Sequence, residues 1–109
     1  MSLASREYIT QAPATPVDIF YRNREISTAI QELLPGKEVG WDILALQSAD
    51  DLERESITPA MLEAAGLPGP PIIFVNVTFK TEELSGADLA ALEARFDLKL
   101  IAELVSDLT

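Results

Sequence analysis

The side chains available for chemistry in this sequence are carboxylates, arginines, lysines, tyrosines and hydroxyls, because its 109 residues include no histidine and no cysteine. A Ser-His-Asp triad, a Cys-His pair and a thiolate nucleophile are therefore excluded. A conventional zinc site, which needs cysteine or histidine ligands, is excluded as well. We expect no cofactor, no metal and no thiol-disulfide oxidoreductase activity.

Carboxylates alone can bind Mg²⁺ or Ca²⁺, and the nearest candidate cluster spans residues 50–55, Asp-Asp-Leu-Glu-Arg-Glu. This cluster lacks the glycine turn and the Asp-x-Asp spacing of a calcium loop. A solvated helix start accounts for it better, so the sequence predicts no metal site here.

Two arginines, Arg22 and Arg24, flank Asn23, which we expect to cap a helix. A helix N-terminus carries partial positive charge and free N–H groups. Two arginines beside it would therefore make a site for a carboxylate, a phosphate or an acidic peptide. The alternative is that Glu25 or Asp18 neutralises the arginines and the patch binds nothing.

Acidic residues outnumber basic ones, 18 to 8, which gives a formal net charge of −10. Such a surface repels the phosphate backbone and anionic lipids, so neither nucleic acid nor a membrane is an expected partner. No apolar run approaches the roughly 20 residues that span a bilayer, and the first residues lack the basic-then-apolar order of a secretion signal. We expect a cytoplasmic protein with one domain.

The first half of the chain predicts an arm, a strand, a helix and a second strand. Residues 1–15 are polar and proline-framed, which indicates a flexible N-terminal arm. The β-branched and aromatic run 17–21 predicts a strand. A helix should follow from Asn23 with one apolar face, and a strand at 39–46 should place the single tryptophan, Trp41, in the core. The apolar face consists of Ile26, Ile30, Leu33 and Leu34, and Pro35-Gly36 should end the helix.

The second half predicts two short helices, two strands and a longer helical region. Asp50 or Asp51 should cap one helix, and Thr58 followed by proline should start the next. Residues 72–75 form a continuous apolar run typical of a central strand, and 77–81 alternate like a more exposed neighbour. Ser85 should cap a helix with a buried stripe, and apolar spacing extends the helical pattern over 98–108 after a break near Phe96-Asp97. The stripe consists of Leu89, Leu92 and Phe96.

The resulting order, β-α-β-α-β-β-α plus an extra C-terminal helical segment, resembles the thioredoxin and glutaredoxin fold. Three segments carry the likeness: Val17-Asp18-Ile19-Phe20, residues 66–74 with their glycines and prolines before an apolar strand, and residues 84–89. The likeness covers about residues 16–96. It implies an α/β three-layer sandwich, with an arm at 1–15 and a single thioredoxin-like domain at 16–109. Right-handed crossovers would make the first three strands parallel.

The same resemblance places Arg24-Glu25-Ile26-Ser27 where the family keeps Cys-x-x-Cys, so the expected protein is redox-inactive. It implies that Asp18 takes the place of the family's buried acid and that Pro71 takes the place of the cis-proline bordering the substrate groove. The alternative is a trans bond in a rigid turn. The binding groove implied in this way consists of Arg22, Asn23, Arg24, Ser27, Pro70 and Pro71.

Three functions follow from this reading. The first is a binding or adaptor module that recognises a protein segment or a small anion at that groove. The second is an assembly component forming a homodimer through the apolar C-terminal helix at 98–108. The third is a glutathione-transferase-like enzyme in which Tyr21 or Ser27 activates a thiol held by Arg24. The partner expected for the first function is a protein.

Overall fold

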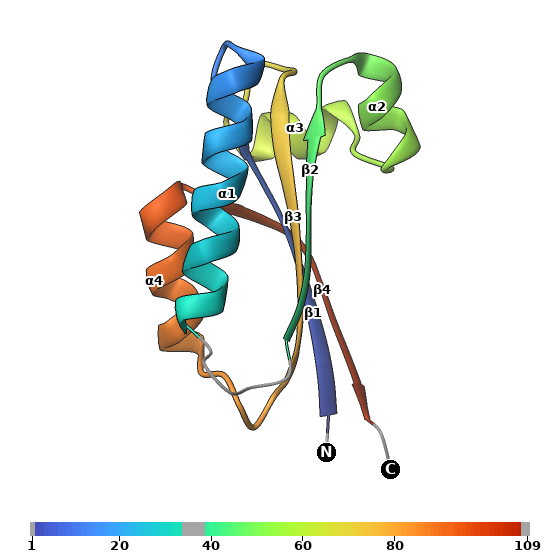
Figure 1. The fold of residues 1–109 in the computed structure, drawn as a ribbon. Coiled ribbons are helices and arrows are strands. Elements are labelled where there is room, and N and C mark those ends of the chain that lie inside the picture. Colours follow the sequence, from blue (N-terminus) through green and yellow to red (C-terminus); the bar gives the residue numbers. More distant parts are fainter. Residues whose placement is uncertain (1, 34–38, 108–109) are drawn as a thin grey trace.

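One four-stranded antiparallel sheet organises the computed structural model, which describes residues 2–33 and 39–107 (Figure 1). Its strands are β1 (Ser2–Gln11), β2 (Val39–Leu46), β3 (Ile72–Lys80) and β4 (Lys99–Asp107), in the order β2-β3-β1-β4. Every neighbouring pair is antiparallel. Consequently β1 runs parallel to β2, with β3 between them, and β3 runs parallel to β4, with β1 between them. These interleaved split βαβ units form a ferredoxin-like arrangement.

Two longer helices, α1 (Pro16–Leu33) and α4 (Gly86–Phe96), cover one face of the sheet (Figure 1). The two short helices α2 (Ala49–Arg54) and α3 (Pro59–Ala64) connect β2 to β3 and lie at the other side of the sheet. Each face therefore has its own core. The larger core joins Tyr8 and Val75 to Ile26 of α1, and the smaller joins Ile9 and Phe74 to the α2–α3 segment.

The start of α1 explains why the strand expected at residues 17–21 is a helix instead. Thr15 caps α1, since its hydroxyl oxygen accepts a hydrogen bond from the N–H of Asp18 at 3.2 Å and its O–H donates to the Asp18 carboxylate at 2.7 Å. Pro16 at the first helical position suits this start. The β-propensity of the following residues is overridden, and Ile19 is buried while Phe20 is exposed.

The expected flexible arm is also wrong, because residues 2–11 form β1 in the middle of the sheet. β1 pairs with β3 on one side and β4 on the other. Tyr8 and Ile9 are fully buried, one in each core. The domain therefore includes residues 2–15, and the prediction of a boundary at residue 16 was incorrect.

The C-terminal segment differs from its prediction as well. α4 ends at Phe96, as the expected break requires, with Asp97 in the left-handed conformation at φ 52° and ψ 44°. The chain then enters β4 rather than a further helix. β3 is one continuous strand where two were expected. The fold is therefore mixed α/β, as predicted, but its all-antiparallel sheet and strand order are not those implied by the thioredoxin resemblance.

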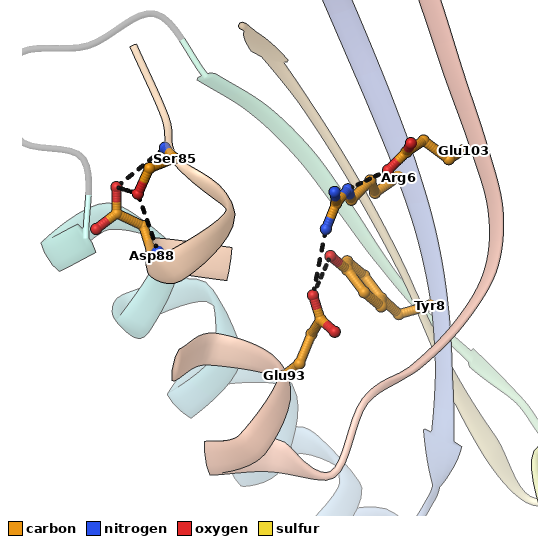
Figure 2. Close-up of polar contacts among 6 residues, drawn as sticks. All are labelled: Arg6, Tyr8, Ser85, Asp88, Glu93 and Glu103. Carbon is orange, nitrogen blue, oxygen red and sulfur yellow. Dashed lines mark hydrogen bonds and ion pairs between the residues drawn. The ribbon is translucent and has the colours of Figure 1, made fainter. Parts of the chain in front are cut away.

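Several local predictions are confirmed. The strand at 39–46 is β2, Thr58 caps α3, and Ser85 caps α4 in a capping box with Asp88 (Figure 2). The first short helix is capped by Ser48 instead of Asp50 or Asp51. The predicted buried residues of the first and last helices that are confirmed are Ile26, Ile30, Leu89, Leu92 and Phe96, whereas Leu34 and Pro35-Gly36 lie outside the described residues.

Within 2–33 and 39–107, no helix is long and apolar enough to cross a membrane. The same residues contain no group of three carboxylates positioned to hold a metal ion.

Candidate functional site

The four predicted site residues of α1 lie inside the helix, more than a turn after its start at Pro16. Asn23 is therefore not a helix cap, and Arg22 and Arg24 do not flank a helix N-terminus. Ser27 is engaged structurally, since its Oγ accepts a hydrogen bond from Trp41 Nε1 at 3.0 Å. That bond ties α1 to β2.

Pro70 and Pro71 are joined by a cis peptide bond, as the resemblance implied. The carbonyl oxygen of Pro71 accepts hydrogen bonds from the N–H of Ala12 at 3.0 Å and from Gln11 Nε2 at 2.9 Å. Gln11 also lines a groove with Arg22, but neither proline does. The six predicted residues therefore do not share one groove.

A groove between α1 and α4 collects three arginines. It consists of two adjoining hollows of about 360 and 330 Å³, which share Glu25 and Arg95. Arg22 lines the first hollow and Arg24 the second. Among the described residues, none of the three arginines has a carboxylate partner within 4.0 Å, and Arg95 lies 5.1 Å from the ring centre of Phe96. The cationic pair predicted from the sequence thus gains Arg95, which sequence reasoning missed.

A second candidate surface is the edge of the sheet formed by β4. Within the described residues, β4 pairs with β1 alone, so one side of its backbone has no strand partner. Three of its large apolar side chains are exposed: Leu100 by 46%, Leu104 by 67% and Val105 by 55%. An unpaired edge with exposed apolar side chains is a template for another strand.

Two hydrogen bonds at the ends of the β1–β3 pairing show to which side the N–H and C=O groups of each β1 residue point. The N–H of Thr81 donates to the carbonyl of Ser2 at 3.1 Å, and the N–H of Ala12 donates to the carbonyl of Pro71 at 3.0 Å. Backbone groups of successive strand residues point to opposite sides. Even-numbered residues of β1 therefore bond to β3, and odd-numbered residues up to the bulge at Glu7 bond to β4.

The same alternation fixes which β4 groups are free. Ser5 is odd-numbered and lies opposite Leu104, so these two residues exchange the bonds of the β1–β4 ladder. The N–H and C=O groups of Glu103 and Val105, on either side of Leu104, must then point away from the sheet. Those four backbone groups are the hydrogen-bonding positions that the edge presents.

The free edge is bordered by a hollow on each face of the sheet. On the α3 face, a hollow of about 390 Å³ lies between α3 and the start of β4. On the α4 face, a hollow of about 170 Å³ lies beside Glu103 and Val105. The larger hollow is lined by Met61, Ala64, Ala65, Leu98, Lys99, Leu100 and Ile101. A strand added beside β4 would direct its side chains alternately to these two faces.

A polar cluster, drawn in Figure 2, shares Arg6 and Glu103 with the lining of the smaller hollow. Arg6 lies between two carboxylates, with its Nη1 3.4 Å from Glu93 Oε2 and its Nε 2.5 Å from Glu103 Oε2. The Arg6 Nε–H is not aligned with Glu103, so that contact is an ion pair without hydrogen-bond geometry. Tyr8 donates its hydroxyl proton to Glu93 Oε2 at 3.1 Å. Burial, aided by the Glu93 carboxylate, raises the pKa of Tyr8 to about 12.

The cluster joins three elements: β1, α4 and β4 (Figure 2). It holds one cation against two carboxylates, so one negative charge is uncompensated. The Glu103 side chain is 42% exposed and lines the smaller hollow, where its carboxylate contacts Arg6 of β1. Sequence reasoning missed this cluster because Arg6 and Glu93 are 87 residues apart and only the β1 pairing brings them together.

Comparison of the chain with protein-family models, with curated proteins and with solved structures found no significant match.

Proposed function

We propose that this protein is a binding module that holds an extended segment of a partner protein as a fifth strand beside β4. Strand addition combines backbone hydrogen bonds, which supply affinity, with pockets for alternate side chains, which supply specificity. The observation that carries the proposal is the free β4 edge, with outward backbone groups at Glu103 and Val105 and a hollow on each face.

From Ala102 onward, β4 lacks the features that usually protect an edge strand, because Lys99 and the register shift both lie before this residue. Lysine, proline or a β-bulge in an edge strand commonly prevents it from pairing with a strand of another chain. Residues 100–106 contain no lysine and no proline, and the register shift lies opposite Glu7/Tyr8, so residues 102–107 pair regularly. The other edge, β2, has a single large exposed apolar side chain, Leu44 at 39%. β4 is therefore the more favourable of the two edges for an added strand.

The occupant we propose is a segment of another protein rather than a second copy of this chain. Each copy carries a formal charge of −10, so two copies repel each other, whereas a basic segment is attracted. A chain without cysteine needs no oxidising compartment, which fits the proposed cytoplasmic location.

The test is a selection of random displayed peptides, nine residues long to match β4, on the immobilised protein. The proposal predicts enriched extended sequences that bind the protein and the variant Val105→Thr but not Val105→Pro. Threonine keeps the outward N–H with a similar shape, whereas proline removes it. Enriched peptides that bind all three proteins equally would overturn the proposal. If no peptide is enriched and the mass of the protein in solution doubles as its concentration is raised, the edge would be assigned to a second copy of this chain instead.

A second candidate function is binding of a small anion in the α1–α4 groove. Arginines bind phosphate and carboxylate through paired N–H groups, and this groove holds three without carboxylate partners among the described residues. Glu25 and Glu32 also line it and reduce its potential. An NMR titration with phosphate, glutathione and an acidic peptide should give saturable shifts around Arg22 and Arg95. No shift with any of the three would exclude this function.

A further inference from the structure

The α4-side polar cluster specifies the chemistry of the segment that fits the β4 edge. Glu103 and Val105 point to the same face of the sheet, because alternate strand residues share a face. Both line the smaller hollow together with Arg6. Glu103 contacts Arg6, but Arg6 also contacts Glu93, so the two carboxylates share one guanidinium.

An antiparallel fifth strand would place one side chain directly opposite each of these two residues. Directly opposed side chains on one face have Cβ atoms about 4.5–5.5 Å apart, which lets opposite charges interact. A lysine or arginine opposite Glu103 would meet a carboxylate that has to share the Arg6 guanidinium with Glu93. An apolar side chain opposite Val105 would cover a residue that is 55% exposed. We take the antiparallel direction because all the pairs in this sheet are antiparallel and such pairs are slightly more stable.

The intervening position of the added strand faces the other side of the sheet. It lies opposite Leu104, the most exposed large side chain of β4 at 67%. An apolar side chain there would cover this leucine. A charged side chain there would lose hydration against an apolar neighbour without gaining a partner.

We infer that the partner segment carries, from its N- to its C-terminal side, an apolar residue opposite Val105, an apolar residue opposite Leu104 and a lysine or arginine opposite Glu103. This inference rests on the proposed strand addition at β4. It adds the order of side chains and the site that recognises the basic one.

The position of Glu103 makes the inference testable by one charge-removing substitution with a matched control. Glu103→Gln removes the carboxylate but keeps the backbone groups and nearly the same shape. Glu7→Gln makes the same change on β1, at a residue that lies opposite Ala102 and outside the Arg6 cluster. General attraction of a basic peptide to an acidic protein would decrease equally in the two variants.

The probe is a capped nine-residue peptide of serine and threonine with a central Val-Val-Lys, compared with Val-Val-Gln and with the reversed order Lys-Val-Val. Dissociation constants are measured by NMR from the amide shifts of residues 99–107. A partly exposed ion pair contributes about 0.2–1 kcal/mol. Val-Val-Lys should therefore bind up to about fivefold more tightly than Val-Val-Gln. Glu103→Gln should abolish this difference, and Glu7→Gln should retain it.

The possible results separate the inference from the function on which it rests. Equal binding of all three peptides at β4 would overturn the inferred side-chain order and leave strand addition intact. Equal losses in Glu103→Gln and Glu7→Gln would overturn the role of Glu103. Shifts confined to residues outside β4, or no shift with any of the three peptides, would overturn both the inference and the proposed function.

Discussion

Proline substitutions at two adjacent β4 residues should have opposite outcomes, because their N–H groups point to opposite sides. Leu104 lies opposite Ser5 in a hydrogen-bonded pair of the β1–β4 ladder, and Val105 points its N–H outward. Both positions are exposed, so the loss of side-chain packing is small in each. A difference in stability between the two proline variants therefore reports on the side to which each N–H group points.

The expected magnitudes follow from these positions. Leu104→Pro loses a ladder bond and leaves the Ser5 carbonyl without its partner, which together should cost about 2–4 kcal/mol of unfolding free energy. Val105→Pro loses less than half of the about 1.5–3 kcal/mol available from burying a valine, because this side chain is 55% exposed. Proline is tolerated on an edge strand where the N–H faces solvent, so no ladder bond is lost at this position. The net change for Val105→Pro should stay within about 1 kcal/mol.

Urea unfolding followed by circular dichroism measures both variants against the original protein and Val105→Thr. The dependence of the unfolding free energy on urea concentration should be similar in all four proteins. Only in Leu104→Pro should the urea concentration at the unfolding midpoint fall substantially. Equal losses for the two proline variants, or a larger loss for Val105→Pro, would refute the assigned backbone directions. The four outward groups proposed at the edge would then be wrong as well.

Other contacts give further expected outcomes. Tyr8→Phe should lower the unfolding free energy by about 1.5 kcal/mol, because a fully buried hydroxyl that donates to a carboxylate is lost. The folded-state pKa of Tyr8 is raised from 10.0 to about 12, so its stabilisation is fully present below pH 10 and lost as pH rises toward 12. Urea titrations at a series of pH values should show that the unfolding free energy falls by roughly 2–3 kcal/mol over this range. The fall should be absent in Tyr8→Phe and present in Tyr21→Phe. Ser85→Ala should cost about 1 kcal/mol by removing the α4 cap, as thermal unfolding would show. Ser27→Ala should shift the fluorescence of Trp41, whose indole N–H loses its acceptor, and an unchanged spectrum would contradict that contact.

Elements with strong local signals were predictable from the sequence. The cap at Ser85 and the apolar run beginning at Ile72 gave α4 and the start of β3. The helix start at Thr58, followed by proline, was also correct. The same Thr-Pro signal occurs at Thr15, where it starts α1, but the β-branched residues after it favoured a strand. Capping was the better guide because it supplies hydrogen bonds to specific N–H groups at the helix start.

Elements defined by distant pairing were not predictable in this way. β1 has a weak alternating pattern, and its place in the sheet depends on pairing with strands as distant in sequence as residues 72–80 and 99–107. Residues 99–107 have an apolar spacing that fits a helix, yet they pair with β1. The sequence did indicate more apolar side chains there than the domain covers, and Leu104 and Val105 are indeed exposed. What the sequence lacked was the register that places Glu103 beside Arg6.

The arginine site was also predictable only in part from the sequence. Arg22 and Arg24 stand out in the sequence as cations in an acidic chain, and both line the α1–α4 groove. Arg95 joins them only because α1 and α4 lie side by side on the sheet (Figure 1). The helix N-terminus expected to reinforce the site lies more than a turn away, at Pro16.

Amide hydrogen exchange along β4, followed by NMR, tests the free edge most directly. In the protein alone, the N–H groups of Leu104 and Ala102 should be protected by β1, and those of Glu103 and Val105 should exchange rapidly. Saturating Val-Val-Lys peptide should protect Glu103 and Val105 and leave the other two unchanged. Protection of Glu103 and Val105 before any peptide is added, or their continued rapid exchange with peptide bound, would contradict strand addition at β4.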